Sequence, residues 1–174
     1  WLEAGAVALC LGLDYQPSAF ADTRELIELS KVAAEYDAIY SAHIRYNDFG
    51  RPKAWRETME ISEQAGIPVH ISHEHVTRET KPLLEEAAQR CDLSFESYLY
   101  GGSCTHLALM MPVWAQAGGP DGIEEMLKDP ERREKVRQHL DRKLNDGSGD
   151  YANFAVTQTG NYIGESIQDL AKKA

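Results

Sequence analysis

The sequence has little of several features that mark particular classes of protein. None of its apolar runs approaches the roughly 20 residues that cross a bilayer, so we expect no membrane-spanning helix. Positive charge is in deficit, because 18 Lys and Arg stand against 28 Asp and Glu, for a net charge of −10. Nucleic acid is therefore not expected as a partner. The most basic stretch, residues 131–143, interleaves both signs and is typical of a solvated helix face.

Cysteine is also scarce. The three cysteines, Cys10, Cys91 and Cys104, show no paired spacing, and no signal-peptide pattern is visible. This usage favours free thiols in a reducing compartment, so we expect a cytoplasmic protein, with Cys10 and Cys91 as small core residues. The sequence begins at Trp1 rather than at a methionine, and the alternation of strand and helix patterns is already under way there. We therefore expect it to be a fragment of a larger protein.

The sequence does contain two histidines that each end an apolar, β-like run. The two segments are Ser41-Ala42-His43-Ile44-Arg45 and Ile71-Ser72-His73-Glu74-His75. His43 and His73 stand 30 positions apart, about the length of one βα repeat, with a helical pattern between them. Such histidines would lie side by side at the carboxyl ends of parallel strands, where they could share a metal ion.

The chain alternates strand and helix patterns as far as Tyr100. Strands are expected over residues 4–13, 39–43, 67–72 and 93–98, with helices starting near Thr23, near Ala54 and at Thr77 or Thr80. In the third strand Val69, Ile71 and His73 should share one face, which would turn His70 toward the surrounding helices.

This order predicts an α/β fold, a partial (β/α)₈ TIM barrel of about four to five parallel βα units. We expect residues 1–100 to form the central βα units. Residues 101–150 should form a loop and a helical insertion in the C-terminal half, and residues 151–174 should return to the barrel as a strand and a helix.

Further segments carry a resemblance to a known family. They are Gly12-Leu13-Asp14-Tyr15-Gln16-Pro17, Tyr40 to Arg45, Gly66 to His73, Tyr98-Leu99-Tyr100, Pro112-Val113-Trp114, Asp129-Pro130 and Ile163 to Ser166. In order and spacing they resemble the N-acyl-D-amino-acid deacylases (D-aminoacylases) of the amidohydrolase superfamily. The resemblance covers nearly the whole chain and implies a metal-dependent hydrolase of the amide C–N bond of N-acyl-D-amino acids or related N-acyl compounds.

The resemblance also implies roles for individual residues. His43 and His73 match two zinc ligands, with one or two Zn²⁺ in the complete enzyme, and the family's catalytic Asp would lie beyond Ala174. Tyr98 matches a tyrosine near the substrate carboxylate, and Arg45, His75 and Cys104 stand at further expected substrate contacts. His75 and Cys104 depart from the residues common there, and Asp14 replaces an expected apolar pocket residue, which leaves the specificity open.

Several alternatives fit the same residues. Arg45 could instead form a helix-capping salt bridge, Tyr98 could be a core aromatic residue, and His43 and His73 could be hydrogen-bonded strand-end histidines without a metal. The parent protein could be a cyclic amidase such as a dihydroorotase or hydantoinase relative, and the chain could be a metal-free structural fragment. We expect this piece to be inactive alone, and its exposed barrel edges could make it a homo-oligomer.

Overall fold

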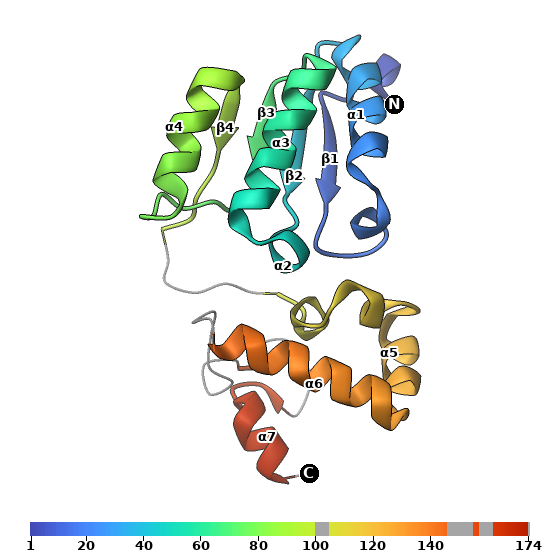
Figure 1. Cartoon of the computed structure of the whole chain (residues 1–174). Coiled ribbons are helices and arrows are strands. Elements are labelled where there is room, and N and C mark those ends of the chain that lie inside the picture. Colours follow the sequence, from blue (N-terminus) through green and yellow to red (C-terminus); the bar gives the residue numbers. More distant parts are fainter. Residues whose placement is uncertain (100–104, 146–154, 157–161, 174) are drawn as a thin grey trace. The chain divides into compact units, whose positions relative to one another are not determined.

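The computed structural model of the chain describes residues 1–99, 105–145, 155–156 and 162–173 (Figure 1). The chain divides into two compact units, Trp1–Ile123 and Glu124–Ala174, and each is described by itself. The expected division at residues 100 and 150 stays a prediction.

The first unit is built on one parallel sheet of four strands in sequence order. The strands are β1 (Ala8–Gly12), β2 (Ile39–His43), β3 (Val69–Ile71) and β4 (Leu93–Phe95). They alternate with the helices α1 (Thr23–Ala34), α2 (Tyr46–Phe49), α3 (Arg51–Ala65) and α4 (Thr80–Arg90). The predicted α/β class is therefore confirmed, and the open four-stranded sheet is consistent with part of a barrel.

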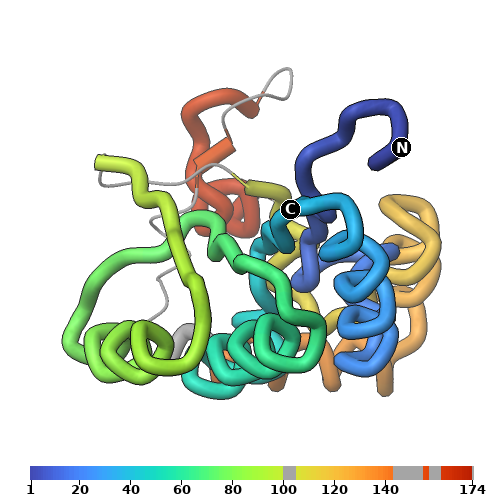
Figure 2. The backbone as a smooth tube through the Cα atoms, turned by 90° about the horizontal axis from the view of Figure 1, so that it is seen from above, coloured from blue at the N-terminus to red at the C-terminus, as the bar shows by residue number. Residues whose placement is uncertain are grey.

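One face of the sheet is covered by helices. Figure 2 shows α1, α3 and α4 side by side along this face, and α3 contacts both neighbours. Alternate strand residues point into this layer and are buried, namely Tyr40, Ala42, Val69 and Ile71. Trp55 and Met59 of α3 pack against them and are almost completely buried. The core therefore lies between sheet and helices.

The opposite face of the sheet carries a polar row. The strand registers align Cys10 with Ser41, Ser41 with His70, and His70 with Ser94. Cys10 is exposed, so the expectation that it is a core residue is wrong, whereas Cys91 is half-buried and packs against the core. The expectation that His70 faces the helices is also wrong, because Val69 and Ile71 occupy that side and the side chains of a strand alternate.

Local signals explain several element boundaries. Gly66 ends α3 in the left-handed conformation with a φ of 67°, which glycine adopts without penalty. The α1 N-cap is Asp22, whose carboxylate accepts a hydrogen bond from the Glu25 backbone N–H at 2.8 Å. The first strand starts later than expected, since Leu2–Ala4 forms a 3₁₀ turn.

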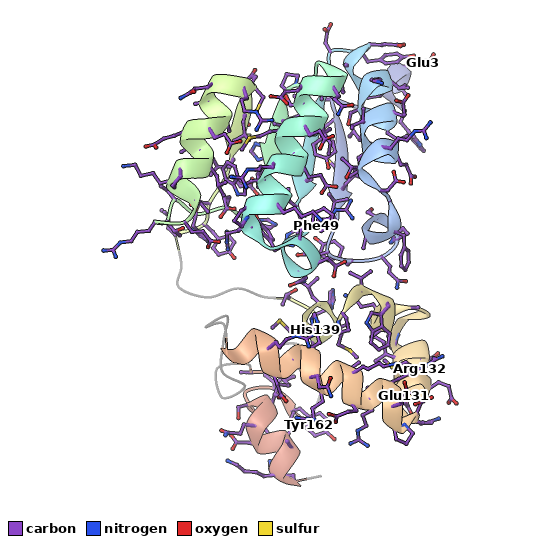
Figure 3. All side chains as sticks on the ribbon, in the orientation of Figure 1. Glu3, Phe49, Glu131, Arg132, His139 and Tyr162 are labelled. Atoms are coloured by element: carbon purple, nitrogen blue, oxygen red, sulfur yellow. The ribbon has the colours of Figure 1, made fainter. Side chains whose placement is uncertain are left out.

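The region after the sheet is helical, as expected. Two 3₁₀ turns, Leu107–Met110 and Val113–Gln116, precede α5 (Gly119–Leu127), α6 (Pro130–Asn145) and α7 (Ile167–Lys173). Glu131 and Arg132, labelled in Figure 3, lie near the start of α6 and are exposed, as a solvated helix face requires. Among the described residues, no helix is long and apolar enough to span a bilayer.

Candidate metal site

The two predicted ligands lie together at the carboxyl edge of the sheet. His43 is the last residue of β2, and His73 follows the end of β3 by two residues. Their imidazole centroids are 5.8 Å apart. Two imidazoles on one tetrahedral Zn²⁺, with Zn–N bonds of about 2.0–2.1 Å, place their centroids roughly 5 Å apart. The two rings are therefore close to the separation that one shared ion requires.

The surroundings of His43 are built mainly by the loop that follows β1. The Leu13 N–H donates to the His43 carbonyl at 2.8 Å, which extends the β1–β2 pairing to the strand ends. The next residue, Asp14, is buried, and its Oδ2 lies 3.2 Å from Nε2 of His43. The ring of Tyr15 lies 5.3 Å from the imidazole centroid, and the ring of Tyr46 approaches it edge-on at 5.4 Å.

The spacing of Gly12 and Tyr15 has a steric reason. Gly12 ends β1, and a Cβ built on it would overlap the Tyr15 ring. Any larger residue at position 12 would push this ring from its place beside His43. The Gly-x-x-Tyr pattern therefore allows an aromatic ring to fold back over the strand end.

His73 is held by a carboxylate that follows β4. Its Nδ1 lies 3.2 Å from Oε1 of Glu96, and its backbone N–H donates to the same oxygen at 3.0 Å. The other oxygen, Oε2, lies 2.5 Å from Nε2 of His70. Burial raises the pKa of Glu96, but the hydrogen bonds from His70 and from the His73 backbone outweigh burial and lower this pKa below its usual value.

The backbone explains why His73 departs from the predicted alternation. β3 ends at Ile71, and His73 adopts a left-handed conformation with a φ of 62°, which is uncommon for a residue other than glycine. The turn brings His73 to the same glutamate as His70. A shared face with Val69 and Ile71 is therefore a wrong expectation for this histidine.

Glu74 organises the turn that carries His73 and His75. Its side chain is 1% exposed and accepts hydrogen bonds from Trp55 Nε1 at 2.8 Å and from the His75 backbone N–H at 2.8 Å. Tyr46 donates its hydroxyl at 3.2 Å, and the Arg51 guanidinium pairs with the same carboxylate. Burial, followed by the neighbouring Glu74 charge, raises the pKa of Tyr46, which keeps this hydroxyl protonated as a donor.

Arg45 lies in a buried ion pair. Its Nε donates to Glu57 Oε2 at 2.8 Å, and both side chains are about 5% exposed. The terminal nitrogens donate to the backbone carbonyls of Ala19 and Ala21, at 3.4 and 2.8 Å. These contacts place Arg45 in a structural ion pair with Glu57, and the substrate contact expected for it stays a prediction.

Of the other expected substrate contacts, Tyr98 lies beside His73, and His75 lies beside Tyr98. The half-buried Tyr98 has its ring centroid 6.0 Å from that of His73 and 5.3 Å from that of His75. Ser97 Oγ lies 2.6 Å from Nδ1 of His75, which fixes this imidazole. Cys104 lies outside the described residues. A substrate role for Tyr98, His75 and Cys104 stays a prediction.

The donor set fits a metal half-site. Among the described residues, Nδ1 of His43 and Nε2 of His73 have no hydrogen-bond partner, and the other nitrogen of each ring faces a carboxylate. Metal-binding histidines characteristically have such a carboxylate partner. No group of three or more Cys, His, Asp or Glu side chains that could hold an ion occurs in the described part of the chain. The structure thus offers two ligands.

Comparisons with known proteins agree with this arrangement. No family model matches the chain. D-aminoacylase of Alcaligenes xylosoxydans xylosoxydans is 34% identical over 114 residues, and N-acyl-D-glutamate deacylase of the same organism is 32% identical over 115 residues. The resemblance to D-aminoacylases is confirmed. Each match covers 61% of this chain but 24% of the relative, so the chain spans about a quarter of these proteins.

Solved structures give the same result. A crystal structure of D-aminoacylase, described as defining a novel subset of amidohydrolases, matches with a TM-score of 0.53 and 32% identity, over 57% of this chain and 23% of its own. N-acyl-D-glutamate deacylase from Bordetella bronchiseptica, complexed with zinc and a phosphonate inhibitor, matches with a TM-score of 0.53 and 33% identity, over 59% and 23%. Another D-aminoacylase structure is described as having a binuclear metal centre.

Sequence reasoning missed the carboxylates of this site. The D-aminoacylase pattern marks Asp14 only as a departure, and it assigns no role to Glu74 or Glu96. The available signal was positional, because Asp14 and Glu96 each follow a strand at the edge that carries His43 and His73. Acidic residues at such strand ends are candidates for contacts to a shared site.

Proposed function

We propose that this chain forms the part of a metal-dependent amidohydrolase that supplies His43 and His73 as metal ligands. The reaction would be hydrolysis of the amide C–N bond of N-acyl-D-amino acids or related N-acyl compounds. One observation carries the proposal: the two imidazoles lie 5.8 Å apart at the strand ends, each with one nitrogen beside a carboxylate. The similarity to D-aminoacylase and N-acyl-D-glutamate deacylase supports the substrate class.

The residues present define what this chain would contribute. A bound zinc ion would lower the pKa of a coordinated water to about 7 and polarise the amide carbonyl. His43 and His73 would hold the ion, Asp14 and Glu96 would orient them, and Glu74 would fix the turn that carries His73. Tyr98, beside His73, and His75, beside Tyr98, are proposed to contact the substrate. Cys104 is retained as a further proposed contact on the resemblance alone.

A cavity next to the site fits a small-molecule substrate. It measures about 730 Å³ and is lined by residues of the β1–α1 loop and of the segment after residue 104, including Tyr15, Gln16, Leu109 and Ile123. Ligand sites in proteins commonly measure about 300–1,000 Å³. Tyr15 also contacts the His43 ring, so this cavity adjoins the proposed metal site. We propose that it accepts an apolar part of the substrate.

A substrate panel tests the reaction. In a protein that carries this sequence within a complete barrel, we expect zinc-dependent release of the free amino acid from N-acyl-D-amino acids. His43→Ala or His73→Ala should abolish this release, whereas Glu79→Ala, at an exposed position before α4, should not. Hydrolysis of dihydroorotate or hydantoins in place of N-acyl-D-amino acids would favour a cyclic amidase, and full activity in both histidine variants would contradict the proposal.

A further inference from the structure

Asp14 is a buried carboxylate with two occupied oxygens. Its side chain is 3% exposed, Oδ2 lies 3.2 Å from Nε2 of His43, and Oδ1 accepts the Asn47 backbone N–H at 2.9 Å. A carboxylate without a proton can only accept hydrogen bonds. The His43 nitrogen that faces it must therefore carry the proton for the contact to be favourable.

We infer that Asp14 is the positioning residue of His43: its carboxylate holds the imidazole with the proton on Nε2 and so leaves the Nδ1 lone pair for the metal. This inference rests on the proposed metal site. It assigns a function to the residue that departs from the D-aminoacylase pattern. The resemblance connects Asp14 only with a change in the substrate pocket.

The backbone around Asp14 fixes the direction of the carboxylate. The Leu13–His43 hydrogen bond joins the two strand ends, and Gln116 Nε2 donates to the Asp14 carbonyl at 3.5 Å. Because the Asn47 N–H occupies Oδ1, rotation of the carboxylate cannot remove Oδ2 from His43 without breaking that bond. Asp14 is therefore placed to select the tautomer rather than merely to lie near the ring.

The occupied Oδ1 makes the Asp14→Asn variant informative. Its single amide oxygen would stay with the Asn47 N–H, so its NH₂ group would face Nε2 of His43. An NH₂ group donates, and Nε2 would then have to accept, which moves the ring proton to Nδ1. Asp14→Glu keeps an acceptor-only group and should preserve the original tautomer.

The experiment is ¹⁵N NMR of the histidine side chains in the full chain without added metal, at a pH at which imidazole is neutral. We expect His43 to be protonated on Nε2 in the unmodified chain and in Asp14→Glu, and to shift toward Nδ1–H in Asp14→Asn. Asp48→Asn removes the same charge from an exposed position and should change nothing. An unchanged His43 tautomer in Asp14→Asn would overturn the inference. If Asp14→Asn does not fold, Asp14→Ala takes its place, because alanine removes the hydrogen-bond acceptor altogether.

Zinc titration supplies a second readout. Loss of a carboxylate partner commonly costs a metal-binding histidine about 10–100-fold in affinity, and we expect that loss in Asp14→Asn but not in Asp48→Asn. Zinc binding that is equal in the unmodified chain and Asp14→Asn would also overturn the inference. If the unmodified chain binds no zinc, the proposed metal site fails, while the tautomer measurement still decides the role of Asp14.

Discussion

At the scale of single residues, buried carboxylates determine how the candidate ligands are presented. Asp14 and Glu96 each hold one imidazole nitrogen, and Glu74 holds the backbone between His73 and His75. A buried carboxylate is costly unless donors surround it, and Glu74 has four of them. The shape of the site therefore depends on groups that would bind neither metal nor substrate.

We predict that Glu74→Ala lowers the free energy of unfolding by about 3 kcal/mol, because Trp55, Tyr46 and Arg51 would lose their shared acceptor. Trp55→Phe removes one donor and should cost about 1–2 kcal/mol. Glu79→Ala, at an exposed position before α4, is the matched control and should stay within about 0.5 kcal/mol. Urea unfolding of the three variants checks this, and equal stability of Glu74→Ala and the control would contradict the account.

At the scale of elements, much of the sheet could be predicted because its signals are local. The strand over 39–43 and the left-handed cap at Gly66 follow from apolar patterning and from the freedom of glycine. The orientation of His73 could not be predicted in the same way, since it depends on where β3 ends. That end is set by the turn around Glu74, which is held by contacts from α2 and α3.

The Arg45–Glu57 pair connects the end of β2 to α3, and Thr23 of α1 donates to the same glutamate at 2.7 Å. We predict that Arg45→Met or Glu57→Gln alone destabilises the chain by about 3–5 kcal/mol, because each leaves a buried charge unpaired. The double variant should cost less than the sum. Denaturant unfolding of all four chains measures the coupling, and strictly additive losses would show that Arg45 has another role.

At the scale of the whole molecule, the sheet has two open edges. Within the described residues, β1 and β4 each pair with one neighbouring strand only, and the sheet face with Cys10 and Ser94 is exposed. Unpaired strand edges favour association with another chain. The open edges could be predicted from the number of strands, because the βα pattern supplies about four to five units and a closed barrel needs eight.

We predict that the isolated chain self-associates, with an average mass that rises with concentration in sedimentation velocity experiments. Val7→Lys places a charge at an exposed position just before the edge strand β1 and should reduce the association. Circular dichroism of this variant controls for folding. A mass that stays monomeric at every concentration would refute this prediction.

The central claim is that His43 and His73 hold one metal ion, and zinc binding to the purified chain tests it most directly. Equilibrium dialysis followed by elemental analysis should find near-stoichiometric zinc in the unmodified chain and in His106→Ala. His43→Ala and His73→Ala should each lose it, because the site offers two ligands and neither imidazole suffices alone. Zinc content that is unchanged in both variants, or no bound zinc even when zinc is added in excess, would contradict the account.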